Sequence, residues 1–432
     1  MPKNFTGTLC IALLAAQLPE VRYFSNAGDD AADGLTPATA WCTLDKLGKD
    51  LPAGGEARLR RGDVFYGQAR LKPGKDASQR TTLAAYGDGA PPEICAYKIA
   101  KPDPSVWTFT GTNNLWRIDL ADDSKFDGNH ATKDGNIGFL KVDGRIYGRK
   151  FFAKNGKIPQ RQWDFIDDHR FLTVWSEGNP ASLARDIRMA PDMTVIPLRD
   201  HIAVRDVVVR GTGGHGVGGV GCDVRFSGCG FFEIGGSRLA GVQDGVTRYG
   251  NGVECWAGSS DVQVLRCAFA DVYDVGFTMQ GWSPPRSWED VHVIDCTFTN
   301  CTQCYELWTT KCPPGTGMKR CTFMRNRCVG SGRGWAYDVR PDKINAAPLL
   351  MYAMETPVCD ILVKDNVFVN SRGLLVFKSG GVSELPESFR IVGNTVVGPA
   401  EQPVANCIGK DKANAESARI EAIRAANTFK SP

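Results

Sequence analysis

The sequence predicts an all-β chain, most of which winds into a parallel β-solenoid. From about residue 200 onward, short runs of β-branched and aromatic residues alternate with Gly, Asn and Asp turns, a pattern typical of many brief strands. The runs recur every 28 to 40 residues, and repeats of roughly 20–50 residues indicate a solenoid, a propeller or an array. Glycine, at 48 of 432 residues, exceeds the usual roughly 7%, as expected when every repeat needs turns.

Two columns define the repeat. The first is formed by small or amide side chains at Cys229, Cys267, Cys296, Asn326, Asn366 and Asn394. The second, two positions later, is mostly aromatic and comprises Phe231, Phe269, Phe298, Cys328, Phe368 and Val396. Each unit holds two or three short strands and lacks the four-strand regularity of a propeller blade, which favours a parallel solenoid. We expect the Asn column to bond the turn backbone and the aromatic column to fill the core.

The N-terminal part of the chain carries a related pattern in the segments 23–30, 33–41, 61–65 and 85–89. Together with the V-x-V-x-x-(N/C)-x-F rungs, these segments resemble the right-handed parallel β-helix proteins of the pectate-lyase-like superfamily, over residues 21–100 and 200–400. The resemblance implies a single-stranded right-handed parallel β-helix with an N-terminal cap. Many members are secreted bacterial carbohydrate-active proteins, but the fold hosts lyases, hydrolases, epimerising enzymes and binding spikes, so it does not fix the chemistry.

The predicted organisation is one long coil with an insertion. Residues 1–20 form either a secretory signal peptide or an N-terminal cap, and 21–100 form the cap and the first coils. Residues 101–200 break the repeat and contain a hairpin at 137–147, which predicts a β-rich insertion. Residues 201–400 form the core with the active-site groove, and 401–432 form a C-terminal cap with helical propensity at 415–426.

Charge, cysteine content and hydropathy limit the partners. The net charge of +3 gives no global basic field, so no nucleic-acid partner is expected. The 15 cysteines are odd in number and several occupy repeat columns, which favours core filling over a disulfide framework. Cys301-x-x-Cys304 has zinc-like spacing, but no second such pair stands at a matching distance, so no metal site is predicted. No stretch reaches the roughly 20 apolar residues that span a bilayer, so no membrane span is expected. We expect the protein to be a monomer that is secreted or periplasmic.

The strand that follows in each repeat is the most informative feature. The predicted strands align at 252–256, 276–280, 304–308 and 334–338. Because successive side chains of a strand point to opposite faces, two apolar columns are expected to face inward. The inward columns are Val253, Phe277, Tyr305 and Trp335, and Cys255, Met279, Leu307 and Tyr337. The outward columns are Glu254, Thr278, Glu306 and Ala336, and Trp256, Gln280, Trp308 and Asp338. One outer face thus carries two carboxylates and two tryptophans in register.

These residue types suit a saccharide. Outward tryptophan is costly unless it binds something, and its flat ring suits the apolar face of a sugar, while paired carboxylates are the usual acid and base for glycosides. Strand positions two rungs apart are separated by about 9.6 Å, near the upper end of the roughly 6.5–9.5 Å carboxyl separation of inverting enzymes. The alternative is that Trp256 and Trp308 pack under the insertion and the glutamates pair with its arginines.

Further candidates surround this face. Asp274 and Asp338 are reserve carboxylates, and His215, in a glycine-rich turn, is either a general base or a hydrogen-bonded turn residue. Arg340 either binds a sugar carboxylate or sulfate or pairs with a nearby Asp, and Asp342 is expected beside it. Gln280 and Trp282 are expected to contact substrate, Trp282 as a groove wall. The acidic run at 28–34 lacks a twelve-residue calcium-loop pattern and is interpreted as a capping turn.

Three functions remain open at this point. The leading hypothesis is a glycoside hydrolase acting on a poly- or oligosaccharide without a cofactor, with Glu254 and Glu306 as the acid/base pair. The alternative is a polysaccharide lyase, which needs a base such as Arg340, His215 or a tyrosine and a cation, commonly calcium, to neutralise the uronate carboxylate. The third is a non-catalytic glycan-binding surface protein.

Overall fold

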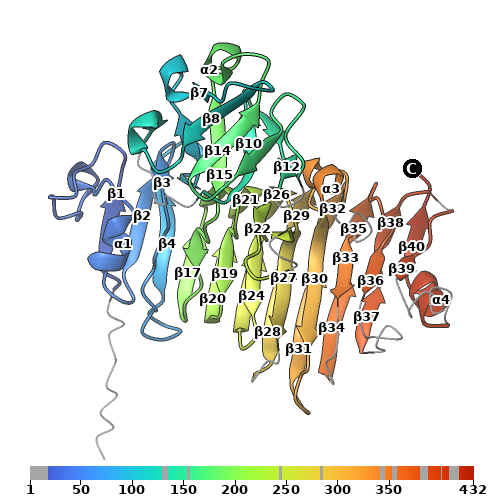
Figure 1. Cartoon of the computed structure of the whole chain (residues 1–432). Helices are drawn as coiled ribbons and strands as arrows, with labels where there is room; N and C mark the ends of the chain where they lie inside the picture. Colours follow the sequence, from blue (N-terminus) through green and yellow to red (C-terminus); the bar gives the residue numbers. More distant parts are fainter. Residues whose placement is uncertain are drawn as a thin grey trace, which may run out of the picture.

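Three long parallel sheets form the body of the protein (Figure 1). The computed structural model describes residues 18–128, 135–152, 156–242, 246–282, 286–340, 346–352, 358–379, 388–399, 401–407 and 418–432. Sheet 1 contains β1 (Val21–Phe24), β2 (Glu56–Arg60), β4 (Thr81–Tyr86), β17 (Ile202–Arg205), β20 (Cys222–Ser227), β25 (Ser260–Leu265), β28 (Trp288–Ile294), β31 (Gly317–Met324), β34 (Val358–Lys364) and β37 (Phe389–Val392). Sheet 2 contains β3 (Val64–Tyr66), β5 (Glu93–Cys95), β18 (Val208–Thr212), β21 (Gly230–Ile234), β26 (Ala268–Val272), β29 (Thr297–Thr299), β32 (Arg327–Val329), β35 (Val367–Val369), β38 (Thr395–Val397) and β40 (Thr428–Lys430). Sheet 3 contains β16 (Ile196–Pro197), β19 (Val217–Gly219), β24 (Val253–Trp256), β27 (Val275–Trp282), β30 (Gln303–Thr310), β33 (Leu349–Tyr352), β36 (Val376–Ser379) and β39 (Ala405–Cys407).

The chain visits the sheets in rotation, so each rung of the coil supplies one strand to each sheet. The rung β25–β26–β27 is followed by β28–β29–β30, and corresponding strands pair in parallel with side chains in register. Identical positions therefore stack: the ring centroids of Phe231 and Phe269 lie 4.9 Å apart, and those of Phe269 and Phe298 lie 4.5 Å apart. The predicted parallel β-helix and its aromatic core column are confirmed.

The predicted Asn column forms a hydrogen-bonded ladder at one corner of the coil. The Oδ1 of Asn326 accepts from the backbone N–H of Cys296 at 2.8 Å, and the Oδ1 of Asn366 accepts from the N–H of Asn326 at 2.8 Å. The ladder continues through Asn394 to Asn427, which accepts from the N–H of Asn394 at 2.8 Å and which the sequence alignment missed. The amides thus satisfy turn backbone groups that the sheets leave unpaired.

Short helices and a second domain-like unit accompany the coil. α1 (Asp45–Lys49) lies near the N-terminal end, and α4 (Ala418–Ala425) buries Ile420 and Ile423 in the solenoid core near the C-terminal end (Figure 1). Two five-stranded sheets form the insertion: one orders β11 (Arg145–Tyr147), β10 (Ile137–Val142), β15 (Ile187–Pro191), β6 (Lys98–Ala100) and β9 (Phe126–Asp127). The other orders β12 (Lys150–Phe151), β13 (Phe165–Asp167), β14 (Phe171–Trp175), β8 (Leu115–Asp119) and β7 (Thr108–Phe109). The remaining elements are α2 (Pro180–Leu183), the 3-10 turns η1 (Pro37–Thr39), η2 (Pro104–Val106) and η3 (Asp123–Lys125), and the two-stranded β22 (Ser237–Arg238) and β23 (Arg248–Tyr249).

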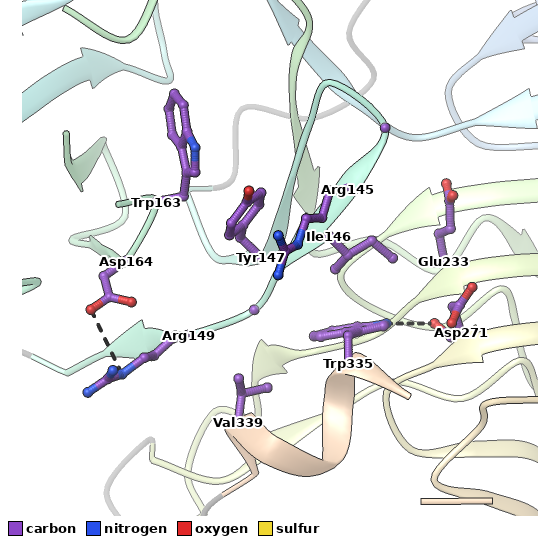
Figure 2. Close-up of a pocket in the computed structure, with 12 residues that line it drawn as sticks. Arg145, Ile146, Tyr147, Arg149, Trp163, Asp164, Glu233, Asp271, Trp335 and Val339 are labelled. Carbon is purple, nitrogen blue, oxygen red and sulfur yellow. Dashed lines mark hydrogen bonds and ion pairs between the residues drawn. The ribbon is translucent and has the colours of Figure 1, made fainter. Parts of the chain in front are cut away.

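The insertion has its own apolar core and is joined to the coil by buried charges. Lys150 is fully buried and its Nζ lies 2.7 Å from Asp167, which also pairs with Arg238 of the coil at 2.8 Å. The β10–β11 hairpin of the insertion faces α3 (Trp335–Val339) of the coil across a pocket (Figure 2). The insertion is therefore docked on the coil.

The prediction that residues 334–338 form a strand of the fourth rung is wrong. Residues 335–339 form the short helix α3 between β32 and β33, and Gly334 is its N-cap. A Cβ at Gly334 would lie 2.2 Å from the backbone oxygen of Asn300, so this glycine lets the chain pass close to the preceding rung before it turns outward. Trp335 consequently packs on Phe139 of the insertion instead of the coil core, and β33 takes the predicted place beside β30.

The cysteines of the described residues are free thiols, and most of them are buried. Cys229, Cys267, Cys296 and Cys328 lie in the solenoid core, as the repeat columns predict. Cys301 and Cys304 are buried there as well. Among the described helices, none is long and apolar enough to cross a membrane.

Candidate functional site

The outer face of sheet 3 brings the predicted carboxylates and tryptophans together. The register pairs Glu254 with Thr278 and Thr278 with Glu306, and it pairs Trp256 with Gln280 and Gln280 with Trp308. The intervening side chains Val253, Cys255, Phe277, Met279, Tyr305 and Leu307 are buried in the core. The alignment of the first three rungs is therefore correct, and we name Glu254, Glu306, Trp256 and Trp308 the carboxylate–tryptophan face.

Glu254 lies in a nest of hydrogen-bond donors. Its Oε2 lies 3.2 Å from His215 Nε2 and 3.1 Å from Asn251 Nδ2, and it also accepts from Gln280 Nε2. His215 Nδ1 accepts from the backbone N–H of Asn251 at 3.1 Å, so the ring hydrogen sits on Nε2 and is donated to Glu254. Three donors aimed at one oxygen suit an ionised carboxylate, which has only acceptors to offer.

Asn251 was not predicted. Its Nδ2 reaches Glu254 because its Oδ1 is held by the backbone N–H of Val275, one rung away, at 3.2 Å. It precedes β24 by two positions, at a corner of the coil. The only sequence signal is its polar amide directly before the Gly252 that begins the aligned strand.

Glu306 has the opposite environment. Its side chain is almost completely buried, and it accepts one hydrogen bond, from Thr278 Oγ1 at 2.8 Å. The pKa of Glu306 is raised to about 8, most strongly by burial and then by the negative charge of Asp274, while the Thr278 hydroxyl and the Arg340 guanidinium act to lower it. At neutral pH this carboxyl therefore holds its proton.

Arg340 and Asp274 form an ion pair beside Glu306. Arg340 Nη1 lies 2.9 Å from Asp274 Oδ1, donates to the backbone oxygen of Tyr273 at 3.1 Å, and its guanidinium lies 5.0 Å from the centroid of the Tyr273 ring. Of the two roles predicted for Arg340, the structure shows pairing with an aspartate. Asp274 is about one fifth exposed, and its contribution at the site is the field it exerts on Glu306.

The aromatic side of the face is open to solvent. The ring centroids of Trp256 and Trp308 lie 6.2 Å apart, and those of Trp308 and Trp282 lie 6.3 Å apart. Trp256 is 37% exposed and Trp282 is 58% exposed. Tyr352, 43% exposed, pairs with Trp308 in the next rung, and the sequence alignment does not include it because it assigns 334–338 to that rung. The tryptophans are thus not covered by the insertion, and the glutamates contact His215, Asn251, Gln280 and Thr278 rather than arginines of the insertion.

One predicted residue does not join the face, and another cannot be placed. Asp338 is exposed on α3, where the structure has no rung strand. Asp342 lies outside the described residues, as do most of the segment 1–20 and part of the loop that follows Trp282. Gln280 serves as a partner of Glu254.

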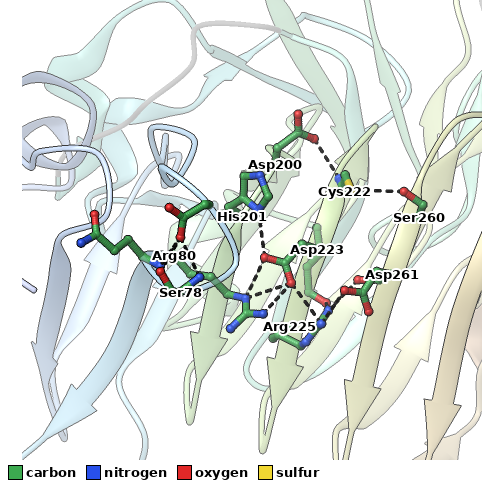
Figure 3. Close-up of polar contacts among 12 residues, drawn as sticks. Ser78, Arg80, Asp200, His201, Cys222, Asp223, Arg225, Ser260 and Asp261 are labelled. Atoms are coloured by element: carbon green, nitrogen blue, oxygen red, sulfur yellow. Dashed lines mark hydrogen bonds and ion pairs between the residues drawn. The ribbon is translucent and has the colours of Figure 1, made fainter. Parts of the chain in front are cut away.

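A second polar cluster lies on sheet 1 and at its edge (Figure 3). The carboxylate of Asp223 accepts three hydrogen bonds of 2.6 to 3.0 Å from the guanidinium of Arg80. It also lies 2.9 Å from His201 Nδ1 and 3.0 Å from Arg225 Nη2. Arg225 in turn reaches Asp261 of the next rung at 2.6 Å. Although burial opposes it, the hydrogen bonds from Arg80 and His201 hold the pKa of Asp223 below its usual value. Because each of these charges is compensated by its neighbours, the cluster acts as a clamp between rungs.

Comparisons with known proteins support the fold. No family model matches the chain, and no curated protein sequence matches it. Among solved structures, the complex of XylC with xylose matches with a TM-score of 0.53 and 10% identity, covering 90% of this chain and 70% of that one. A glycoside hydrolase matches with a TM-score of 0.47 and 11% identity over 95% and 96% of the two chains. The lacto-N-biosidase of Eubacterium ramulus matches with a TM-score of 0.38 and 12% identity over 96% and 67%. The chain therefore has the architecture of the right-handed parallel β-helix proteins.

Proposed function

We propose that the protein hydrolyses glycosidic bonds of a poly- or oligosaccharide, with Glu306 as the general acid and Glu254 as the ionised partner. One observation carries the proposal: two carboxyl groups on one sheet face have environments that favour opposite protonation states. Burial and the Asp274 charge hold a proton on Glu306, whereas three donors converge on Glu254. A pair divided in this way is what acid/base cleavage of a glycoside requires at neutral pH.

The proposed reaction uses only these side chains. Glu306 donates its proton to the glycosidic oxygen as the bond from that oxygen to the anomeric carbon breaks. Glu254 takes a proton from a water molecule, whose oxygen forms the new bond to the same carbon. Because the two residues start from strand positions two rungs, about 9.6 Å, apart, the spacing favours inversion over the roughly 5–5.5 Å arrangement of retaining enzymes. No cofactor is needed.

The substrate class follows from the aromatic side of the face. Exposed tryptophan rings beside carboxylates offer flat apolar surfaces for sugar rings. A protein of the same fold has been solved with xylose bound, which agrees with a saccharide ligand. A polysaccharide substrate also fits a secreted or periplasmic location, which follows if residues 1–20 are a signal peptide rather than an N-terminal cap.

Hydrolysis is favoured over β-elimination because two of the candidate lyase bases, Arg340 and His215, are engaged. Arg340 is paired with Asp274, and His215 directs its Nε2 hydrogen at Glu254. A lyase would release an unsaturated uronate, so a rise in absorbance in the unsaturated-uronate band during digestion of pectate or alginate would support elimination instead. A purely glycan-binding solenoid would release no product.

The test is turnover of Glu254→Gln and Glu306→Gln on a glycan library, with reducing ends as the readout. Removing an acid or base group is expected to lower kcat by about 10²–10⁴-fold. Glu289→Gln is the matched control, because Glu289 lies on β28 of sheet 1 and pairs with Lys319 and Arg320. Wild-type rates for both test variants, each shown by its melting curve to be folded at the assay temperature, would contradict the proposal.

A further inference from the structure

A second pocket lies where the insertion meets the coil, apart from the carboxylate–tryptophan face. It has a volume of about 510 Å³, within the range of small-ligand sites. The insertion contributes Tyr147 and Trp163, and the coil contributes Glu233, Asp271 and Trp335 (Figure 2). None of its lining residues is Glu254 or Glu306. We name it the junction pocket.

Aromatic side chains form its walls and are held in place. The ring centroids of Tyr147 and Trp163 lie 6.3 Å apart. Trp335 donates its indole N–H to the backbone oxygen of Asp271 at 3.1 Å, and its ring packs so closely on Gly148 that a Cβ there would lie 2.4 Å away. The pocket walls are thus formed before any ligand arrives.

Trp163 adopts a backbone conformation that bulky residues rarely take. Its φ is +67°, in the left-handed region, and its indole lines the pocket. The backbone N–H of Trp163 is held by the oxygen of Trp175 at 3.0 Å. Strained backbone that the surroundings enforce is concentrated at binding sites, where it aims a particular side chain.

The coil also departs from its own repeat at this pocket. At the C-terminal ends of the sheet 2 strands, successive rungs place a residue with positive φ, and outside the pocket these residues are Gly211, Asn300, Gly330 and Asn370. At the two rungs that line the pocket they are Glu233 and Asp271, with φ of 56° and 55°. Gly, Asn and Asp adopt positive φ more readily than glutamate does, so the backbone conformation alone does not explain why a glutamate stands at position 233.

The charged groups of the pocket are largely compensated. Glu233 lies 2.5 Å from Lys141 Nζ and accepts from Tyr97 Oη at 2.9 Å. Asp164 lies 3.8 Å from Arg149. Burial, and then the charge of Glu233, raise the pKa of Asp271. The lining therefore offers hydrogen-bonding groups beside aromatic rings without a strong excess of either charge.

We propose that the junction pocket is a second carbohydrate site that binds a neutral oligosaccharide segment. The choice of a saccharide rests on the proposed function, and the pocket itself rests on its volume, its rings and its corner carboxylates. Sugar rings stack on the aromatic walls and their hydroxyls bond the paired side chains. The carboxyl groups of Asp164, Glu233 and Asp271 outnumber the guanidinium groups of Arg145 and Arg149 in the lining, which disfavours an acidic sugar. Trp335 packs 5.6 Å from the ring of Tyr273, the residue before Asp274, so the two sites are neighbours.

The test follows binding of xylotriose, cellotriose and maltotriose to the full chain, with trigalacturonate as the anionic probe. We expect a neutral probe to protect residues 144–149 and 335–339 from hydrogen–deuterium exchange. Tyr147→Ala is expected to weaken that binding about tenfold, as measured by calorimetry. Arg145→Ala tests the same wall of the pocket at an exposed residue, so it does not remove a half-buried ring from the fold. Phe109→Ala is the control, because Phe109 is 47% exposed elsewhere on the insertion.

The outcomes separate this proposal from the proposed function. If no neutral probe protects 144–149, or if only trigalacturonate does, the junction pocket is not a neutral saccharide site, whatever the turnover of the enzyme. If Tyr147→Ala and Arg145→Ala both bind like the Phe109→Ala control while melting normally, the proposal is equally overturned. If Glu254→Gln and Glu306→Gln keep wild-type turnover while Tyr147→Ala still loses binding, the pocket stands and the catalytic assignment falls.

Discussion

Arg340 Nη1 and Asp274 Oδ1 lie 2.9 Å apart, and this ion pair sets the electrostatic balance at Glu306. The carboxylate of Asp274 raises the pKa of Glu306, and the guanidinium of Arg340 lowers it. Removing one member therefore leaves the charge of the other unopposed by its partner at Glu306. Since a general acid works only while protonated, the alkaline limb of the pH–rate profile reports the pKa of Glu306 and hence the combined effect of these two charges.

The two members of the pair are predicted to have opposite effects on that limb. Asp274→Asn leaves the positive Arg340 beside Glu306, so the limb near pH 8 should move to lower pH. Arg340→Gln leaves the negative Asp274, so the limb should move to higher pH. The measurement is kcat/KM from pH 5 to 10. Shifts in the same direction for both variants would show that Glu306 is not the titrating acid.

Replacing the buried acid is predicted to stabilise the protein in a pH-dependent way. Because the pKa of Glu306 is about 8 in the fold and near 4.5 when unfolded, the folded chain binds the extra proton between these values. The stability that the protonated carboxyl provides is complete below pH 4.5 and is lost as pH rises toward 8. Glu306→Gln carries no such loss, so its advantage in unfolding free energy should grow from pH 5 to pH 8, to about 4 kcal/mol at most.

Thermal melts of the wild type and Glu306→Gln across this range give the measurement. Glu289→Gln is again the control: hydrogen bonds from Arg320 and Lys319 lower the pKa of Glu289, so its replacement should bring no gain at high pH. A pH-independent difference between Glu306→Gln and the wild type would contradict the buried-acid assignment.

The carboxylate–tryptophan face was predictable because strand alternation and repeat spacing are local signals. Val253, Phe277 and Tyr305 occupy one inward column, so their neighbours Glu254 and Glu306 had to face outward. The same logic failed at Trp335, because a helix of one turn shows no periodicity in sequence and its first residue resembles the others in the column.

The remaining parts of the site depend on contacts between distant residues. Asn251 reaches Glu254 only because the next rung fixes its amide, and Tyr352 joins the aromatic rings only because residues 335–339 form a helix and β33 supplies the strand of that rung. The junction pocket needs the insertion docked on α3, as Tyr147 and Trp335 come from segments nearly two hundred residues apart. No repeat pattern encodes such a contact.

Trp308 is predicted to bind substrate rather than to support the fold. It lies between Trp256 and Trp282 on the outer face, with centroid distances of 6.2 and 6.3 Å. Trp308→Ala should therefore raise KM about tenfold and change the melting temperature little, since stacking on an aromatic ring contributes about 1 kcal/mol or more. Trp116→Ala, which removes a ring packed at a tilt against Phe109 in the insertion, is the matched control and should leave KM unchanged. A fall in kcat alone would assign Trp308 to the reacting centre instead.

The Asn ladder is predicted to stabilise the coil rung by rung, and Asn366 is its most informative member. The side chain of Asn366 is buried, accepts from the N–H of Asn326 at 2.8 Å, and donates to the backbone oxygen of Phe323 at 2.8 Å. Asn366→Ala leaves both groups buried and unpaired, which costs about 1–3 kcal/mol for each, so the melting temperature should fall clearly.

The decisive measurement for this variant is local. Because the lost bond is specific, the amide of Asn326 should lose its protection from hydrogen exchange, while the amides of β25 and β28, farther along the coil, keep theirs. Thr297→Ala is the control, since Thr297 is exposed beside the same corner and belongs to no ladder bond. Equal protection of the Asn326 amide in both variants would mean that sheet pairing and the aromatic stack alone stabilise the coil, and that the side-chain amides contribute nothing measurable.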